Sequence, residues 1–208
     1  MSLQREKPPL VLASGSAARA RLLAEAGLRF EIRPADFDEA TARKAARAQG
    51  CTASEAACQL AIGKALLVSR LHPGSMVIAA DQILSLGDAP GDIWLEKPAG
   101  RAEAAGQLRM LRGREHVLAS AVVCATAGTL KFRHVGEAGL RFRNYSDALL
   151  EAVLTADAAS VGSSVGGYRL EGPGILLCEA IEGDFPTILG LPLLPLLGFL
   201  RAAGIIIG

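Results

Sequence analysis

The stretch Leu10-Val-Leu-Ala-Ser14-Gly15-Ser16-Ala-Ala-Arg19 decides how the chain begins to fold. A short apolar run breaks at Ser-Gly-Ser, and a segment with helical periodicity follows from Ala20 to Gly27. The pattern predicts a strand, a tight turn and a helix with Arg19 in its first turn and Gly27 just past its end. The unpaired N–H groups at such a helix start favour anions, phosphate above all. Taken alone, the stretch is more often an ordinary α/β connection, so the rest of the chain decides.

The composition is that of a folded protein with a sizeable core. Half of the 208 residues are hydrophobic and 21% are charged, which excludes a disordered chain. This length fits one large domain or two small lobes, and we expect a single domain over residues 1–208. The net charge of +1 argues against a nucleic-acid binder that relies on bulk electrostatics. Any anion site must therefore be built locally.

Cysteines, histidines and apolar runs give no sign of a zinc site, a disulfide framework or a membrane span. The four cysteines form no C-x-x-C pair, the three histidines lie far apart, and free thiols in a reducing compartment are expected. The polar N-terminus has no signal-peptide core, and the apolar segment 188–200 is short and holds two prolines. We expect a soluble, cytoplasmic protein that binds no membrane.

The chain alternates strand and helix patterns early and shows long β-prone runs late. Strands are expected at 30–33, 76–80, 83–86, 93–95, 116–125, 130–143 and 175–178, the third and fourth as a hairpin. Helices are expected from the capping box Thr52-Ala-Ser-Glu55 to about Arg70, at 101–111, from Ser146 to about Thr155, and from about Pro192 to before Gly204. A glycine-rich segment covers 161–174. This order indicates an α/β fold with a mixed, twisted sheet flanked by helices.

Asp81 follows the apolar run 76–80 and is the strongest candidate for chemistry. A carboxylate at the carboxyl end of a buried strand is costly without a role there, and ligands of open α/β sheets bind at that edge. The alternative is an Asp that only caps the next turn. Lys97, held in extended backbone by Pro98, and Lys64, which interrupts an apolar helix face, are further candidates. Each lysine alone is better explained as a solvated or snorkelling side chain.

The acidic segment Asp36-Phe-Asp38-Glu39 offers hard oxygen ligands suited to Mg²⁺ or Mn²⁺, although most acidic turns are merely solvated. No P-loop, dinucleotide-binding or nucleophile-elbow motif is present. A hydroxyl-lined helix start, two lysines, a strand-end carboxylate and an acidic turn together suit the hydrolysis of a nucleoside triphosphate. Basic groups and a metal offset the triphosphate charge, and a carboxylate activates the attacking water.

Segments along nearly the whole chain, in this order, resemble the Maf family of nucleoside triphosphate pyrophosphatases. They are Leu12-Ala13-Ser14-Gly15-Ser16-x-x-Arg19-x-x-Leu22-Leu23, Asp38-Glu39, Leu60-Ala61-x-x-Lys64-Ala65, Ile78-Ala-Ala-Asp81-Gln82, Lys97-Pro98, Leu111-Arg-Gly113-Arg-x-His116, Gly167-Tyr168-x-x-Glu171-Gly172, Ile181-Glu182-Gly183-Asp184 and Leu189-Gly190-Leu191-Pro192. No single piece is diagnostic, but their order and spacing together are specific.

The resemblance implies an elongated α/β fold like that of the inosine triphosphate pyrophosphatases, with the nucleotide in a cleft between two lobes. It implies hydrolysis of a nucleoside triphosphate to the monophosphate and pyrophosphate, with Mg²⁺ or Mn²⁺ as the cofactor. Carried over by position, Asp81 resembles the proton acceptor that activates water, and Glu39 and Asp81 resemble the metal-side carboxylates. The positions that resemble the family's phosphate-binding residues are Ser14, Ser16, Arg19, Lys64 and Lys97.

Three positions associated with base choice in the family are Ala18, Gln82 and Glu171 in this chain. The branch that prefers dTTP and UTP carries Arg, Thr and Gln there. Gln82 and Glu171 resemble the branch acting on 7-methyl-GTP, but Ala18 replaces its bulky aromatic residue and Ala17 replaces the usual proline. Glu171 can accept from the N1–H and N2 amine of guanine, and Ala18 leaves room for a purine. We therefore expect a guanine-type base.

Two other functions fit parts of the pattern. The family has been linked to septum formation, so the alternative is a nucleotide-binding regulator of cell division with little turnover. A sugar-nucleotide transferase with a Ser-Gly-x-x-x-Arg opening is a third possibility. Asp81 and Glu39 favour the enzyme, because carboxylates beside an anion site would only weaken a pure binder. We expect a house-cleaning pyrophosphatase that acts on a nucleoside triphosphate, binds no nucleic acid and forms a homodimer.

Overall fold

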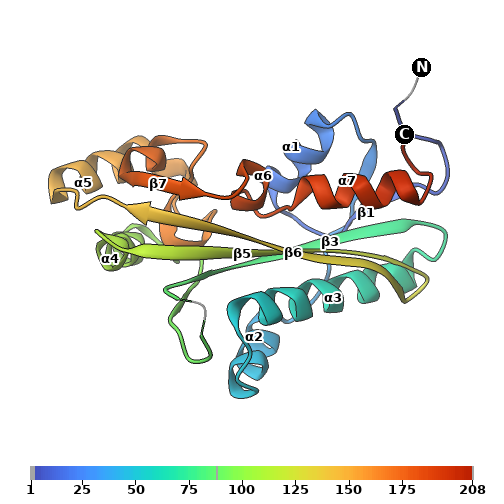
Figure 1. The fold of residues 1–208 in the computed structure, drawn as a ribbon, viewed down its shortest axis with the longest axis horizontal. Helices are drawn as coiled ribbons and strands as arrows, with labels where there is room; N and C mark the ends of the chain where they lie inside the picture. Colours follow the sequence, from blue (N-terminus) through green and yellow to red (C-terminus); the bar gives the residue numbers. More distant parts are fainter. Residues whose placement is uncertain (1–2, 88, 208) are drawn as a thin grey trace.

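The computed structural model describes residues 3–87 and 89–207, and Figure 1 shows its helices and strands. The strands are β1 (Leu10–Leu12), β2 (Phe30–Ile32), β3 (Met76–Ser85), β4 (Trp94–Leu95), β5 (Glu115–Thr126), β6 (Thr129–Phe142) and β7 (Cys178–Glu182). The helices are α1 (Ala17–Glu25), α2 (Glu39–Ala48), α3 (Ala53–Leu71), α4 (Arg101–Leu111), α5 (Asp147–Ala156), α6 (Phe185–Ile188) and α7 (Leu193–Ala202), with 3₁₀ turns η1 (Ala158–Ser160), η2 (Val165–Gly167) and η3 (Pro173–Leu177). No helix in these two ranges is both long and apolar enough to cross a membrane.

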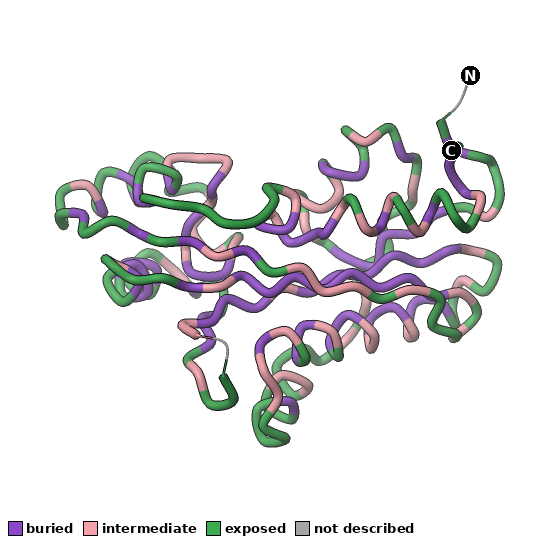
Figure 2. The backbone as a smooth tube through the Cα atoms, viewed as in Figure 1, coloured by how far each residue is buried: buried purple, intermediate pink, exposed green. Residues whose placement is uncertain are grey.

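The described strands form one seven-stranded sheet in the order β2-β1-β3-β5-β6-β7, with β4 paired to β3. β1 runs parallel to β2 and β3, and the other pairs are antiparallel. β3 and β5 form the buried centre of the sheet, as the purple parts of the tube in Figure 2 show. The expected α/β class with a mixed sheet flanked by helices is confirmed.

At one end of the sheet α3 covers one face and α1 and α7 cover the other, while α4 and α5 lie at the opposite end (Figure 1). α3 packs on one face through small side chains such as Ala57 and Ala61, while α1 and α7 cover the opposite face with Leu23 and Leu196. At the far end of the sheet, α4 and α5 enclose a third apolar cluster that includes Phe142. Burial of this apolar surface is the main stabilising term. The long central strands therefore run through two lobes.

Strand β3 is longer than the sequence predicts, and this changes the position of Asp81. The expected strand end at Asp81 is wrong, because residues 76–80 and 83–85 belong to one strand and Asp81 pairs with Ala121 of β5 in its middle. β1 pairs with β3 only at residues 76–78, and β4 only at residues 84–85. The β1-side edge of β3 is therefore open around Asp81, beyond the carboxyl end of β1, where α/β sheets bind ligands.

The start of α1 and the long antiparallel strands agree with the sequence prediction. Ser16 caps α1, Gly27 follows its end with φ +77°, and the β5–β6 turn lies at residues 127–128 as expected. A left-handed backbone of this kind is strained for any residue with a Cβ, which is why glycine ends the helix.

Two expectations about single elements are wrong, and one helix was not predicted. The acidic segment 36–39 is not only a turn, because Asp38 caps the helix α2 by accepting from the Thr41 N–H at 2.9 Å. Residues 175–177 belong to the 3₁₀ turn η3, which Pro173 opens, and the strand β7 starts only at Cys178. The short helix α6, capped by Asp184, has no counterpart in the prediction.

Candidate active site

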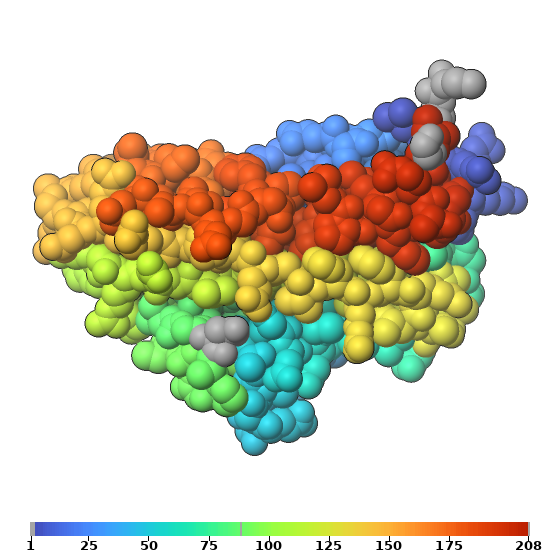
Figure 3. All heavy atoms as spheres, viewed as in Figure 1, coloured from blue at the N-terminus to red at the C-terminus, as the bar shows by residue number. Residues whose placement is uncertain are grey.

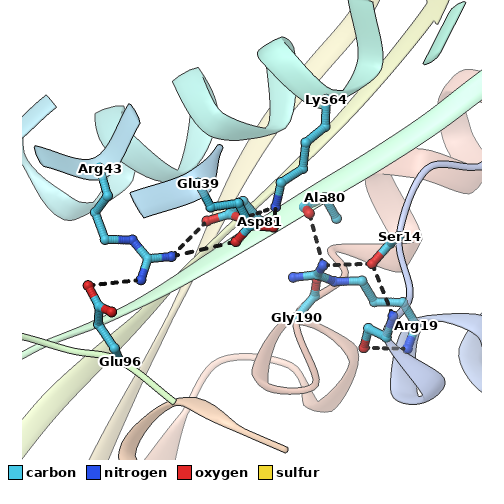
Figure 4. Close-up of polar contacts among 10 residues, drawn as sticks. Ser14, Arg19, Glu39, Arg43, Lys64, Ala80, Asp81, Glu96 and Gly190 are labelled. Carbon is cyan, nitrogen blue, oxygen red and sulfur yellow. Dashed lines mark hydrogen bonds and ion pairs between the residues drawn. The ribbon is translucent and has the colours of Figure 1, made fainter. Parts of the chain in front are cut away.

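The carboxyl end of β1 and the first turn of α1 form a polar pocket wall. Ser16 has an extended backbone at the helix start, and its Oγ accepts from the Arg19 N–H at 3.4 Å. The Ser14 Oγ accepts from the Ser16 N–H at 3.3 Å and from Arg19 Nη1 at 3.0 Å. The two serines thus turn the chain into the helix and align Arg19; Figure 4 shows the contact between Ser14 and Arg19.

Arg19 ties the helix start to two distant segments. Its Nη1 donates to the Ala80 carbonyl at 2.9 Å, on the open edge of β3, and its Nε donates to the Gly190 carbonyl at 2.8 Å. Gly190 has φ +91°, and a Cβ there would lie 3.3 Å from Arg19 Nη2. Desolvation lowers the pKa of Arg19, although the charges of Asp81 and Glu39 oppose the shift. The guanidinium stays charged, because its reference pKa is far above neutral.

Asp81, Lys64 and Glu39 form a compact charged group on the α3 side of β3 (Figure 4). Lys64 Nζ donates to Asp81 Oδ1 at 2.5 Å and lies 2.7 Å from Glu39 Oε1. Asp81 and Lys64 are only 3% and 5% exposed, so the pair is buried. Lys64 does not snorkel to solvent as an isolated lysine would. Desolvation raises the pKa of Glu39, but the hydrogen bond and charge of Lys64 outweigh it, and the pKa is lowered.

Arg43 completes this group, and the sequence analysis missed it. Its Nη2 lies 3.9 Å from Asp81 Oδ2 and 4.0 Å from Glu39 Oε2, while its Nη1 lies 3.3 Å from Glu96 Oε1. Arg43 is one helical turn after Glu39, so recognising α2 is what reveals it. The helix signal was present, because Asp38 precedes an alanine-rich segment of good helix formers.

These groups line one cleft of about 610 Å³ that opens over the free edge of β3. Lys97 lies on its rim, and desolvation together with the charge of Arg19 lowers its pKa. The glycine-rich segment contributes Tyr168 and Glu171 to the cleft lining. The lining includes all ten residues singled out by the sequence analysis: Ser14, Ser16, Ala18, Arg19, Glu39, Lys64, Asp81, Gln82, Lys97 and Glu171. Asp36 is not part of this lining.

Gln82 lies next to Asp81 on the opposite face of β3 and is held firmly. Its Nε2 donates to Ser120 Oγ at 2.9 Å, to the Ile188 carbonyl at 2.9 Å and to the Thr187 carbonyl at 3.2 Å. Because these acceptors use the amide nitrogen, the carboxamide oxygen is the atom left for a ligand.

Glu171 lines the same cleft and comes close to α1. Its carboxylate is 16% exposed and lies 3.8 Å from Arg21 Nη2, on the outer side of α1. Ala18, one turn from Arg21 on the same helix, lines the cleft with a methyl group only. This end of the cleft therefore combines an acceptor with space.

Comparison with known proteins identifies the family. The sequence matches the profile described as Maf-like protein over residues 9–203. The chain belongs to the Maf family. It is 50% identical over 206 residues to a protein of Bradyrhizobium diazoefficiens named nucleoside triphosphate pyrophosphatase, covering 99% of each chain. Proteins of the same name from Rhodospirillum rubrum and Rhodopseudomonas palustris are 42% and 47% identical, over 96% and 99% of this chain and 97% and 99% of theirs.

The donor set of this Maf protein fits a divalent cation that is completed by substrate oxygens. Among the residues that the structure describes, no group of three or more His, Cys, Asp and Glu side chains could hold a metal alone. Asp81 and Glu39 nevertheless present Oδ2 and Oε2 on the side away from Lys64, and Asp81 Oδ2 is buried without a hydrogen-bond partner. Mg²⁺ is usually held by one or two carboxylates together with substrate phosphates and water. Glu39 and Asp81 would hold such an ion.

Proposed function

We propose that this Maf protein hydrolyses a guanine-type nucleoside triphosphate to the monophosphate and pyrophosphate with the help of Mg²⁺ or Mn²⁺. Family membership and the names of its relatives support the pyrophosphatase activity. The observation that carries the proposal is the Asp81 carboxylate, buried beside Lys64 with one oxygen unpartnered, in a cleft that also holds a helix start. This combination suits attack by water on a phosphoanhydride.

The triphosphate would lie along the first turn of α1. The hydroxyls of Ser14 and Ser16 and the N–H groups at the start of α1, together with Lys97, offer donors and positive charge for its oxygens. The Arg19 side chain already donates to the Ala80 and Gly190 carbonyls, and it adds a fixed positive charge beside the triphosphate. A divalent cation at Glu39 and Asp81 would supply further charge neutralisation at the phosphates.

In the reaction, Asp81 accepts a proton from water as the water oxygen bonds to the α-phosphorus. The bond from the α-phosphorus to the α,β-bridging oxygen breaks, and pyrophosphate leaves with that oxygen. Lys64 holds Asp81 Oδ1 at 2.5 Å, so Oδ2, which has no hydrogen-bond partner, is the oxygen left to accept the proton. Burial of both groups keeps the carboxylate in one orientation, which favours catalysis by positioning.

Glu171 and Ala18 support a guanine-type base. The Glu171 carboxylate can accept from the N1–H and N2 amine of guanine, a pair of donors that pyrimidines do not present. The small Ala18 leaves space for a purine ring or for a 7-methyl group. GTP and 7-methyl-GTP are therefore the substrates we expect first. The homodimer and the cytoplasmic location stay predictions.

A screen of ordinary and modified nucleoside triphosphates for pyrophosphate release tests the proposal. We expect pyrophosphate as the first product with Mg²⁺ or Mn²⁺, and loss of turnover in EDTA. Orthophosphate as the first product contradicts attack at the α-phosphorus. Nucleotide binding without turnover of any substrate favours the regulatory alternative instead.

The same screen with Glu171→Gln distinguishes recognition of the base from the hydrolysis step. The variant should lose its preference for guanine over uracil nucleotides while it keeps the pyrophosphate product. Glu25→Gln is the matched control, because Glu25 is the other carboxylate beside Arg21 at 3.9 Å and does not line the cleft. An unchanged substrate profile in Glu171→Gln means that Glu171 does not contact the base.

A further inference from the structure

Two cations bracket the same pair of carboxylates from opposite sides (Figure 4). Lys64 Nζ contacts Asp81 Oδ1 and Glu39 Oε1 at 2.5 and 2.7 Å. Arg43 Nη2 faces the other two oxygens, Asp81 Oδ2 and Glu39 Oε2, at 3.9 and 4.0 Å. Arg43 therefore lies where a divalent cation bound between these carboxylates would lie.

The two cations differ in how tightly they are bound. Lys64 makes short hydrogen-bonded contacts and is 5% exposed, whereas Arg43 stays beyond hydrogen-bonding distance of both carboxylates. Arg43 is nevertheless enclosed, with its side chain 14% exposed and its Nε buried without a hydrogen-bond partner. Its contact at 3.3 Å is with the more exposed Glu96, outside the carboxylate pair. Arg43 thus neutralises the pair by charge alone, and a stronger ligand can replace it.

We propose that Arg43 occupies the metal position in the free enzyme and moves onto the triphosphate when metal and nucleotide bind. The proposal rests on the metal dependence inferred above. A guanidinium that loses two carboxylates to a divalent cation needs new anionic partners, and the triphosphate in the same cleft supplies them. Arg43 then becomes a substrate-binding residue that the family resemblance did not assign here.

Arg43 is well placed for this exchange, because α2 has a second anchor one turn away from it. Arg47, one turn further along α2, stacks over the Trp94 ring at 4.3 Å and donates to the Asp92 carbonyl at 3.4 Å. Figure 3 shows atoms of α2 and of the β3–β4 connection side by side at the lower edge of the molecule. The helix can therefore stay in place while the Arg43 side chain changes partners.

The exchange makes an unusual prediction about binding. Arg43 competes with metal for Glu39 and Asp81, but it helps to bind phosphate. Arg43→Gln should therefore bind metal alone more tightly and a triphosphate without metal more weakly. A variant that merely damages the site would weaken both. Each change should be about tenfold, the scale of one charge-assisted hydrogen bond.

Two titrations on the full chain test this. The first measures Mn²⁺ binding to the nucleotide-free protein from the electron paramagnetic resonance signal of unbound Mn²⁺. The second measures binding of inorganic tripolyphosphate in EDTA by calorimetry, so the result does not depend on the base. Lys44→Gln is the matched control, because Lys44 is the exposed neighbour on α2 and removes the same charge. Arg43→Lys should restore tripolyphosphate binding in part.

Opposite changes in the two affinities of Arg43→Gln, with Lys44→Gln like the wild type, support the proposal. Two weakened affinities, or two unchanged ones, overturn it while the proposed metal-dependent hydrolysis stands. Failure of the wild type and of Arg43→Gln alike to bind Mn²⁺, together with full turnover in EDTA, overturns the metal dependence and this proposal with it.

Discussion

Asp81 shows how one charged residue is accommodated in the middle of a buried strand. A lone carboxylate at 3% exposure would be strongly destabilising, and Lys64 offsets this cost with a 2.5 Å hydrogen bond. Buried ion pairs of this kind are rarely favourable over apolar packing. The pair is therefore better explained by chemistry than by stability, since it leaves Asp81 Oδ2 without a hydrogen-bond partner in a residue that lines the cleft.

The first prediction concerns this oxygen. Asp81→Asn keeps the size of the side chain and an acceptor for Lys64, but it removes the proton acceptor. We expect kcat for pyrophosphate release to fall by about 100-fold or more, the usual scale for a lost general base. Initial rates at saturating substrate measure it. Asp36→Asn, outside the cleft lining, should keep normal rates, and near-normal turnover in Asp81→Asn would show that another group activates the water.

Among the helices and strands, α2 is one that the sequence did not predict, and part of the site was missed with it. Ser14, Arg19, Lys64 and Asp81 lie in segments whose strand or helix pattern is clear, and the cleft brings them together. Arg43 was missed because residues 36–39 look like a solvated turn. The one buried residue of this helix is the small Ala46, so no stripe of large apolar side chains marks it, and its N-cap was the main signal.

The helix α3 carries Lys64, and its start supports the second prediction. Thr52 and Glu55 form a reciprocal capping box, in which Thr52 Oγ1 accepts at 3.2 Å and Glu55 Oε2 accepts at 2.9 Å. Thr52→Ala removes the N-cap acceptor and should cost about 1 kcal/mol. For a chain of this size that lowers Tm by about 2–4 °C.

Differential scanning calorimetry measures this effect in the intact protein. Thr52→Ser is a suitable control, because serine keeps the hydroxyl that accepts at the N-cap. The control should leave Tm unchanged or slightly raised. An equal loss of Tm in both variants would mean that the capping box contributes nothing of its own.

For the whole molecule, the sequence predicted the class of fold and its long helices and strands, but not where two predicted segments form one continuous strand. The apolar run of residues 76–85 is interrupted by Asp81 and Gln82, which made one strand look like two. These polar side chains can lie in a buried strand because the fold brings distant partners to them. Lys64 pairs with Asp81, and Ser120 and the α6 carbonyls accept from Gln82. Local patterns cannot show contacts between such distant segments.

Stability at low pH depends on a buried histidine in the second lobe. His116 is 1% exposed, its Nε2 lies 2.7 Å from the Tyr168 hydroxyl, and Phe142 packs edge-on against its ring. Burial lowers the pKa of His116 from 6.5 to about 4. Between these two values the unfolded chain binds more protons than the folded one, so stability falls as the pH falls. Above pH 6.5 the contribution is complete and constant.

The third prediction follows from this shift. From pH 7 to pH 4, His116 should remove roughly 3 kcal/mol from the free energy of unfolding. Urea unfolding curves at both values measure the loss, and His116→Gln should lose less by that amount because its amide does not titrate. Tyr168→Phe should keep the wild-type loss, because it removes the hydrogen bond but leaves the buried imidazole. Equal losses in wild type and His116→Gln would mean that this imidazole does not titrate in the unfolding reaction, and that acid sensitivity arises from the carboxylates alone.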